Sequence, residues 1–323
     1  MTQLRSITLG TRGNVVKKSA DGTIFLSSPE PLKPYRKRYT ESLEYWAAAA
    51  PDRIFLGQRA NDGSWRTVTY QDAHNSVQRL SQFFLDRGLS VERPLMILSG
   101  NDIEHALLAL AAMHVGVGYA PISVSFSLLS SDHGKLRHTY KVLTPGLVFA
   151  ASGRMFQRAI DSVVPESVEV LVTQDAPTGR RSTIFSDAVA TPITAAVAER
   201  ARSVGEDSLA KILFTSGSSA MPKGAINTNR MLCSNQQMSV QTWPFLSEAP
   251  PVFVDWLPWN HTFGGNFVFG LALHFGGSLY IDNGRPTPQD ISKTVENIRE
   301  IRPTCYVGVP KCYEMLLPYF DAD

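Results

Sequence analysis

The chain has 323 residues, of which 43% are hydrophobic and 19% charged, and its net charge is +2. This balance is typical of a globular protein with about two domains' worth of chain, and so small a charge argues against nucleic acid or an anionic membrane surface as a partner. The longest apolar stretch, 106–122, is interrupted by His114 and several glycines, so we expect no membrane-spanning helix. The N-terminus has no apolar signal core and the three cysteines have no CxxC spacing; both features predict a cytoplasmic protein with reduced thiols.

The first elements expected are a helix over 40–52 and a β-hairpin after it. The strand-like runs 53–59 and 65–70 flank the sequence ANDGS, in which Asp62-Gly63 is a strong hairpin-turn signal.

From residue 70 onward, segments of helical period alternate with apolar runs of strand length. Asn101 or Asp102 is placed to cap one of the helices. Strands are expected at 93–100, 117–123, 145–151, 167–174, 209–216, 251–258, 278–282 and 304–310. Helices are expected at 70–88, 103–116, 127–143, 229–243, 264–277, 289–301 and 311–320. The alternation predicts an α/β fold with mixed or parallel sheets covered by helices on both faces.

A small and polar stretch divides the chain. Residues 181–205 are expected to be a linker or surface excursion. Residues 1–180 then form a first α/β subdomain with an irregular, proline-rich N-terminal segment, and residues 206–323 form a second one.

A run of hydroxyl and glycine residues follows the strand expected at 209–216, at the end of the strand where open α/β sheets bind ligands. Small residues let backbone N–H groups approach phosphate oxygens, hydroxyls add donors, and a lysine adds a cation. The candidate phosphate ligands are Thr215, Ser216, Gly217, Ser218, Ser219 and Lys223. Their segment is expected to be a strand-to-helix turn, and a flexible Ser/Gly linker is the alternative.

Known templates narrow the kind of loop. The Walker A motif fails because Pro222 stands where its second glycine is required and Gly224 stands where its hydroxyl is required. No G-x-G-x-x-G follows the strand, which argues against a dinucleotide-binding loop. No G-x-S-x-G occurs anywhere in the chain, which argues against a serine hydrolase.

The segment LFTSGSSAMPKGAINT resembles the phosphate loop of the adenylate-forming superfamily, whose members join a carboxylic acid to AMP and typically read T-S-G-T-T-G-x-P-K-G-V. Ser218 and Ser219 replace threonines and keep the hydroxyls, whereas Ala220 replaces a glycine and is the one departure. The matching positions are Thr215, Ser216, Gly217, Pro222, Lys223 and Gly224.

Other segments resemble the same superfamily in the same order, and most closely its feruloyl-CoA synthetases, which activate hydroxycinnamic acids. They are RPLMILSGNDIEHALLALAAMHVGVGYAPIS, GKLRHTYKVLTPGLVFAA and LPWNHTFGGN, and the likeness runs from about Pro29 to the end of the chain.

The resemblance implies the N-terminal domain of an adenylate-forming enzyme, with a small-molecule carboxylic acid, ATP and CoA as substrates and Mg²⁺ as cofactor. It assigns catalytic roles to Lys223 and His261, and it assigns the acid-binding pocket to His261, Phe263 and Gly264. No metal-ligating residues are predicted, because the histidines are not spaced as metal pairs.

Four later motifs of the superfamily are not found: its aromatic-Gly-x-Thr-Glu segment, its T-G-D, its hinge residue and its C-terminal lysine. The sequence therefore leads us to expect a truncated N-terminal portion that does not complete thioester formation alone. Ligation of another aryl or fatty acid and a non-catalytic nucleotide- or ligand-binding module stay open as alternatives, as does a homodimer.

Overall fold

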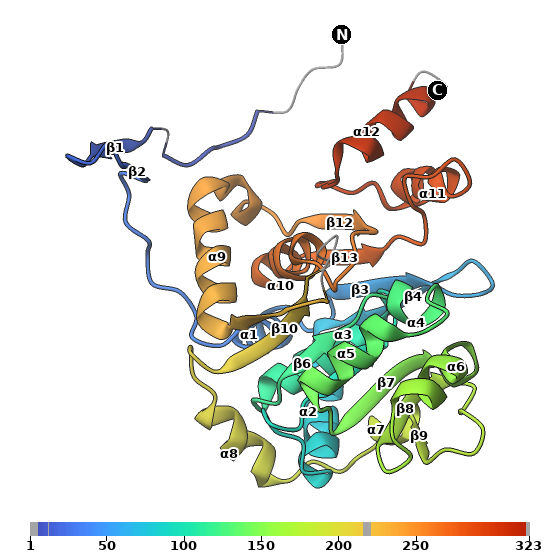
Figure 1. Cartoon of the computed structure of the whole chain (residues 1–323). Coiled ribbons are helices and arrows are strands. Elements are labelled where there is room, and N and C mark those ends of the chain that lie inside the picture. The colour runs from blue at the N-terminus through green and yellow to red at the C-terminus, as the bar shows by residue number, and fades with distance from the viewer. Residues whose placement is uncertain (1–5, 12, 216–220, 321–323) are drawn as a thin grey trace.

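The computed structural model describes residues 6–11, 13–215 and 221–320, which are arranged around a seven-stranded and a four-stranded sheet (Figure 1). The order in the larger sheet is β11-β10-β6-β5-β7-β8-β9, and its neighbours are parallel except for the antiparallel pair β10 and β11. Its strands are β5 (Leu95–Leu98), β6 (Tyr119–Pro121), β7 (Leu147–Ser152), β8 (Glu169–Gln174), β9 (Ser182–Ile184), β10 (Leu209–Phe214) and β11 (Gly224–Thr228).

Side chains of the central strand β5 alternate between the two faces of this sheet, as a strand's pleat requires. Leu95 and Ile97 belong to a core shared with α2 (Tyr70–Asp86) and α3 (Ile103–His114). The other face packs against α5 (Gly134–Leu143) and α6 (Gly153–Val163). Helices therefore cover both faces, and the α/β class predicted from the alternation is confirmed.

The smaller sheet has the order β12-β13-β3-β4. Its strands are β3 (Ile54–Arg59), β4 (Trp65–Thr69), β12 (Val252–Asp255) and β13 (Ser278–Ile281). The antiparallel hairpin of β3 and β4 is confirmed, and Gly63 takes the left-handed conformation (φ 83°) that its turn needs. Phe55 and Leu279 of this sheet share the core of α2 and α3, so these two helices lie between the sheets.

The remaining helices surround the two sheets (Figure 1). The α-helices are α1 (Glu41–Ala49), α4 (Ser125–Leu128), α7 (Phe185–Ala188), α8 (Ala195–Ser203), α9 (Asn229–Thr242), α10 (Phe269–Phe275), α11 (Ile291–Ile301) and α12 (Pro310–Leu316). Short 3₁₀ turns lie at Pro244–Ser247 and Leu317–Tyr319, and a π-helix lies at Phe263–Val268. The two strands β1 (Val15–Lys18) and β2 (Ile24–Ser27) form a separate hairpin that projects from the body of the molecule.

Two of the predicted elements are wrong. The helix expected over 127–143 is two helices, α4 and α5, because Asp132 accepts from the Gly134 N–H and His133 takes a left-handed conformation (φ 52°) that no helix continues through. The strand expected at 304–310 is absent. In this described stretch Cys305 forms an isolated bridge with Phe253, and the Thr304 and Cys305 N–H groups donate to the Val252 carbonyl, so only the start of the stretch pairs with β12.

Between the proposed subdomains, residues 181–205 contain β9, α7 and α8, and β9 extends the larger sheet as its edge strand. The division at 1–180, 181–205 and 206–323 stays a prediction.

Candidate functional site

The predicted phosphate loop connects two antiparallel strands. The Thr215 N–H donates to the Lys223 carbonyl at 3.0 Å, which closes the hairpin of β10 and β11 around the loop. The expected strand-to-helix turn is therefore wrong: β11 intervenes before α9, because Gly224–Thr228 completes the edge of the larger sheet. The predicted ligands Ser216, Gly217, Ser218 and Ser219 lie outside the described residues, and so does Ala220.

The exit of the loop is held closely to the body of the domain. A Cβ at Gly224 would lie 2.9 Å from Ile212 Cγ2, so a glycine permits the tight pairing of the two strands. His138 of α5 donates from Nε2 to the Pro222 carbonyl at 3.0 Å. Lys223 is exposed, so its ammonium is available to an anion in the loop.

The aromatic and histidine-containing segment follows β12. His261 is exposed, and its Nδ1 accepts the Phe263 N–H at 3.3 Å, so the neutral ring carries its proton on Nε2. Asn101, in the segment between β5 and α3, holds this segment in place: its Nδ2 donates to the Leu257 carbonyl at 2.9 Å and its Oδ1 accepts the Trp259 N–H at 3.0 Å. Asp102, not Asn101, caps α3.

The π-helix places the predicted acid-binding residues. Such helices are rare and occur frequently at functional sites. Phe263 lines a pocket of about 400 Å³, and its ring lies 5.9 Å from that of Phe267. Gly264 is buried instead against the segment before it, because a Cβ there would lie 2.4 Å from the Leu257 carbonyl oxygen. The other residues that line the pocket are Met231, Leu232, Asn235, Thr262 and Asn266.

Both strands of the phosphate hairpin are bonded to this π-helix. From β10, the Lys211 ammonium donates to the Gly265 carbonyl at 2.7 Å. From β11, Asn227 Oδ1 accepts from Asn266 Nδ2 at 2.7 Å. The two strands that flank the predicted phosphate loop are thus bonded directly to the helix that carries Phe263.

Lys211 is 1% exposed, and burial lowers its pKa to about 7. Among the described residues it has no carboxylate within ion-pairing distance, so its charged form is poorly compensated. Burying this ammonium costs free energy, and the bond to the Gly265 carbonyl is the contact that the ammonium gains in return.

Asp255 ends β12 and is 2% exposed. Its Oδ1 accepts the Leu257 N–H at 3.2 Å, whereas its Oδ2 is buried without a partner in the described part of the chain. Burial raises the pKa of this carboxyl to about 8, and the charge of Asp282 adds to the rise. Asp255 therefore holds a proton at neutral pH.

Asn101, Lys211 and Asn227 carry no sequence signal of their roles, because each acts on a backbone or side-chain group distant in the chain. From the sequence, Asn101 is a candidate helix cap, Lys211 is part of a strand and Asn227 falls in the expected strand-to-helix turn. Only the packing of the hairpin and the 255–268 segment reveals the contacts.

A family model described as AMP-binding enzyme matches residues 43–323, which is most of the chain. The chain belongs to the AMP-binding enzyme family. Among curated relatives, a putative fatty-acid–CoA ligase, fadD25 of Mycobacterium tuberculosis, is 26% identical over 67% of this chain and 35% of its own length.

Solved structures of this AMP-binding fold agree with the arrangement described above. A putative long-chain-fatty-acid CoA ligase from Rhodopseudomonas palustris superimposes with a TM-score of 0.71 at 21% identity, covering 87% of this chain and 65% of that one. ATP-bound MatB from the same organism superimposes with a TM-score of 0.64 at 25% identity, covering 85% and 51%. The chain spans less than half the length of the curated relatives it matches.

Within the described ranges, none of the helices is long and apolar enough to cross a membrane. The same residues include no group of three or more His, Cys, Asp or Glu arranged to hold a metal ion.

Proposed function

We propose that the full-length enzyme to which this chain belongs activates an aromatic carboxylic acid of the hydroxycinnamic type with ATP and then transfers the acyl group to CoA. The observation that carries the proposal is the direct bonding of both strands of the phosphate hairpin to the π-helix that bears Phe263. An acid in the pocket and a triphosphate in the loop would then be held by one connected framework, as reaction between them requires.

In the first step the acid's carboxylate oxygen attacks the α-phosphorus of ATP, and pyrophosphate leaves as the acyl-adenylate forms. The loop, with Thr215 and Lys223 at its two ends, holds the β- and γ-phosphates and neutralises charge on the leaving pyrophosphate. ATP use is supported by membership of the AMP-binding family and by the ATP-bound state of MatB.

In the proposed reaction His261 donates to the carboxyl from Nε2, because its Nδ1 accepts the Phe263 N–H. In the second step the CoA thiolate attacks the acyl carbon and AMP leaves. Mg²⁺ would neutralise phosphate oxygens in the first step. We assign no side chain of the described residues to it, since they contain no suitable cluster.

The pocket supports an aromatic acid more than a long aliphatic one. Phe263 and Phe267 offer ring faces to an aromatic substrate, and Thr262, Asn235 and Asn266 add polar groups suited to ring hydroxyls. A volume of about 400 Å³ fits a substrate of one ring and a short side chain. The fatty-acid ligase among the relatives keeps a fatty acid as the second candidate.

Pyrophosphate release by the full-length protein with a panel of acids tests the proposal. We expect ferulate and 4-hydroxycinnamate to support release, decanoate to support little, and Lys223→Ala to lower the rate by about 10²-fold or more. Lys141→Ala, at an exposed lysine of α5, is the matched control and is expected to keep the wild-type rate.

A preference for decanoate would replace the aromatic acid with a fatty acid. No release with any acid, together with an effect of Lys223→Ala on ATP affinity, would instead support a nucleotide-binding module without catalysis.

A further inference from the structure

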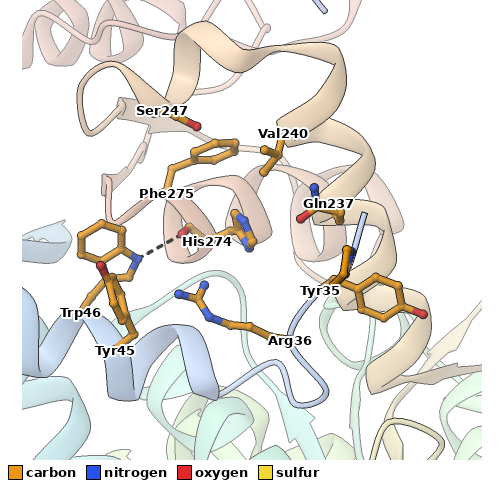
Figure 2. Close-up of a pocket in the computed structure, with 10 residues that line it drawn as sticks. Tyr35, Arg36, Tyr45, Trp46, Gln237, Val240, Ser247, His274 and Phe275 are labelled. Carbon is orange, nitrogen blue, oxygen red and sulfur yellow. Dashed lines mark hydrogen bonds between the residues drawn. The ribbon is translucent and has the colours of Figure 1, made fainter. Parts of the chain in front are cut away.

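A second pocket, of about 550 Å³ (Figure 2), shares no lining residue with the pocket at Phe263 or with the strands β10 and β11. It is enclosed by the segment before α1, by α1 itself, by the second half of α9 and by the end of α10. Its lining residues are Pro34, Tyr35, Arg36, Tyr45, Trp46, Gln237, Val240, Ser247, His274 and Phe275. Nothing in the proposed ligase reaction uses them.

Arg36 is the positive charge of this pocket. Figure 2 shows its guanidinium extending between Tyr45 and His274. It donates to Ser42 Oγ at 2.9 Å and lies 5.1 Å from the centre of the Tyr45 ring. In the described part of the chain, no carboxylate lies within ion-pairing distance of Arg36. The charge of Glu41 does act on Arg36, but the Glu41 carboxylate forms its ion pair with Arg38. A half-buried guanidinium in this state favours an anionic partner.

The aromatic wall opposite Arg36 is held in place before any ligand arrives. Trp46 donates from Nε1 to the His274 carbonyl at 3.1 Å, and the Arg53 guanidinium lies 5.2 Å from the centre of its ring. The same indole packs on Gly276, where a Cβ would lie 2.5 Å from the ring. A fixed wall of this kind lowers the entropy cost of binding a flat ligand.

The other polar side chains that line this pocket are neutral. Burial, with repulsion by Arg36 in second place, lowers the pKa of His274 to about 4, so its imidazole is uncharged at neutral pH. Gln237 contributes a carboxamide and Ser247 a hydroxyl at the rim. The pocket thus offers one cation, a few neutral donors and acceptors, and several aromatic rings. This lining matches a ligand that has one negative charge and an aromatic ring.

We propose that this pocket is a second ligand site, which binds a small aromatic carboxylate by a charged contact to Arg36 and ring contacts to Tyr45 and Trp46. The guanidinium fork matches both carboxylate oxygens, and the flanking rings take up the aromatic part of the ligand. Occupancy would tie the segment at Pro34–Arg36 to α1, α9 and α10.

The test is a titration of the chain with sodium 4-hydroxycinnamate, followed by ¹⁹F NMR after labelling its five tryptophans with 5-fluorotryptophan. Trp46→Phe assigns the Trp46 resonance. We expect this resonance to shift saturably in wild type. Arg36→Gln should weaken the apparent affinity about tenfold or more, and Arg36→Lys, which keeps the charge and loses the fork, should weaken it less.

Arg158→Gln, at an exposed arginine of α6, is the matched control and should leave the affinity unchanged. The other tryptophan resonances report whether each variant is folded. Absence of a Trp46 shift at millimolar ligand, or equal affinity of wild type and folded Arg36→Gln, would overturn the site.

Two further arms separate the alternatives. Loss of the Trp46 shift in Phe263→Ala would place the binding in the other pocket and overturn the proposal. An equal, Arg36-dependent response to inorganic phosphate would overturn the assignment of the ligand as an aromatic carboxylate. Neither arm requires ligase activity, so the proposed function can fail while this site stands.

Discussion

Replacement of Lys211 by methionine should change how stability depends on pH. Methionine keeps the length and apolar stem of the side chain but removes the titrating ammonium and its bond to the Gly265 carbonyl. The pKa of Lys211 is about 7 in the folded chain because of burial, against 10.5 for an ordinary lysine.

The sign follows from proton binding. Below pH 7 the folded and unfolded states both hold the proton, so the lysine contributes no pH dependence. Between about pH 7 and 10.5 the unfolded state binds one more proton than the folded state, so wild-type stability rises with pH by up to about 1.4 kcal/mol per unit. From pH 7 to pH 10 the free energy of unfolding of wild type should gain about 3–4 kcal/mol relative to Lys211→Met.

Urea unfolding followed by tryptophan fluorescence at pH 7, 8, 9 and 10 measures this difference. Lys141→Met, at an exposed lysine, should track wild type across the range. A wild-type to Lys211→Met difference that stays constant from pH 7 to 10 would refute the reasoning, because Lys211 would then keep its proton in the folded chain.

Substitutions at three further positions test the titration and packing around the site. Burial raises the pKa of Asp255 to about 8, so the folded state binds more protons than the unfolded state between about pH 4 and 8. In the same urea assay, wild type should therefore lose stability relative to Asp255→Asn as pH rises from 5 to 8, and parallel curves for the two proteins would contradict this. Gly264→Ala should cost about 1–3 kcal/mol of unfolding free energy, because its Cβ would meet the Leu257 and Pro258 carbonyl oxygens. Gly205→Ala, with open space around it, is the control. Equal costs for the two variants would show that the backbone around Gly264 accommodates a methyl group without strain. Asn101→Ala should cost about 1–3 kcal/mol of unfolding free energy, because it removes the donor to the Leu257 carbonyl and the acceptor of the Trp259 N–H. Asn75→Ala on the α2 surface is the control, and an Asn101→Ala chain as stable as that control would show that these two hydrogen bonds are dispensable.

The sequence by itself determined the elements whose signals are local. Apolar runs located β5, β7, β8, β10 and β12 because buried strands need such runs, and Asp62-Gly63 located the β3–β4 hairpin because its turn needs a positive φ. The order of motifs was enough to indicate the adenylate-forming family, which the match over 43–323 bears out. The motifs do not identify the acid substrate, which stays a proposal.

Only the tertiary structure decided the contacts between parts far apart in the chain. The phosphate loop became a hairpin because Gly224–Thr228 finds its partner in β10, and a short segment of five residues has no period that distinguishes a strand from a helix start. In the sequence, Lys211 is a single charged residue in an apolar strand. The packing of the folded chain buries it against Gly265, which lies 54 residues later. The pocket at Arg36 likewise exists only because α1, α9 and α10 meet there, and no local pattern encodes which helices meet.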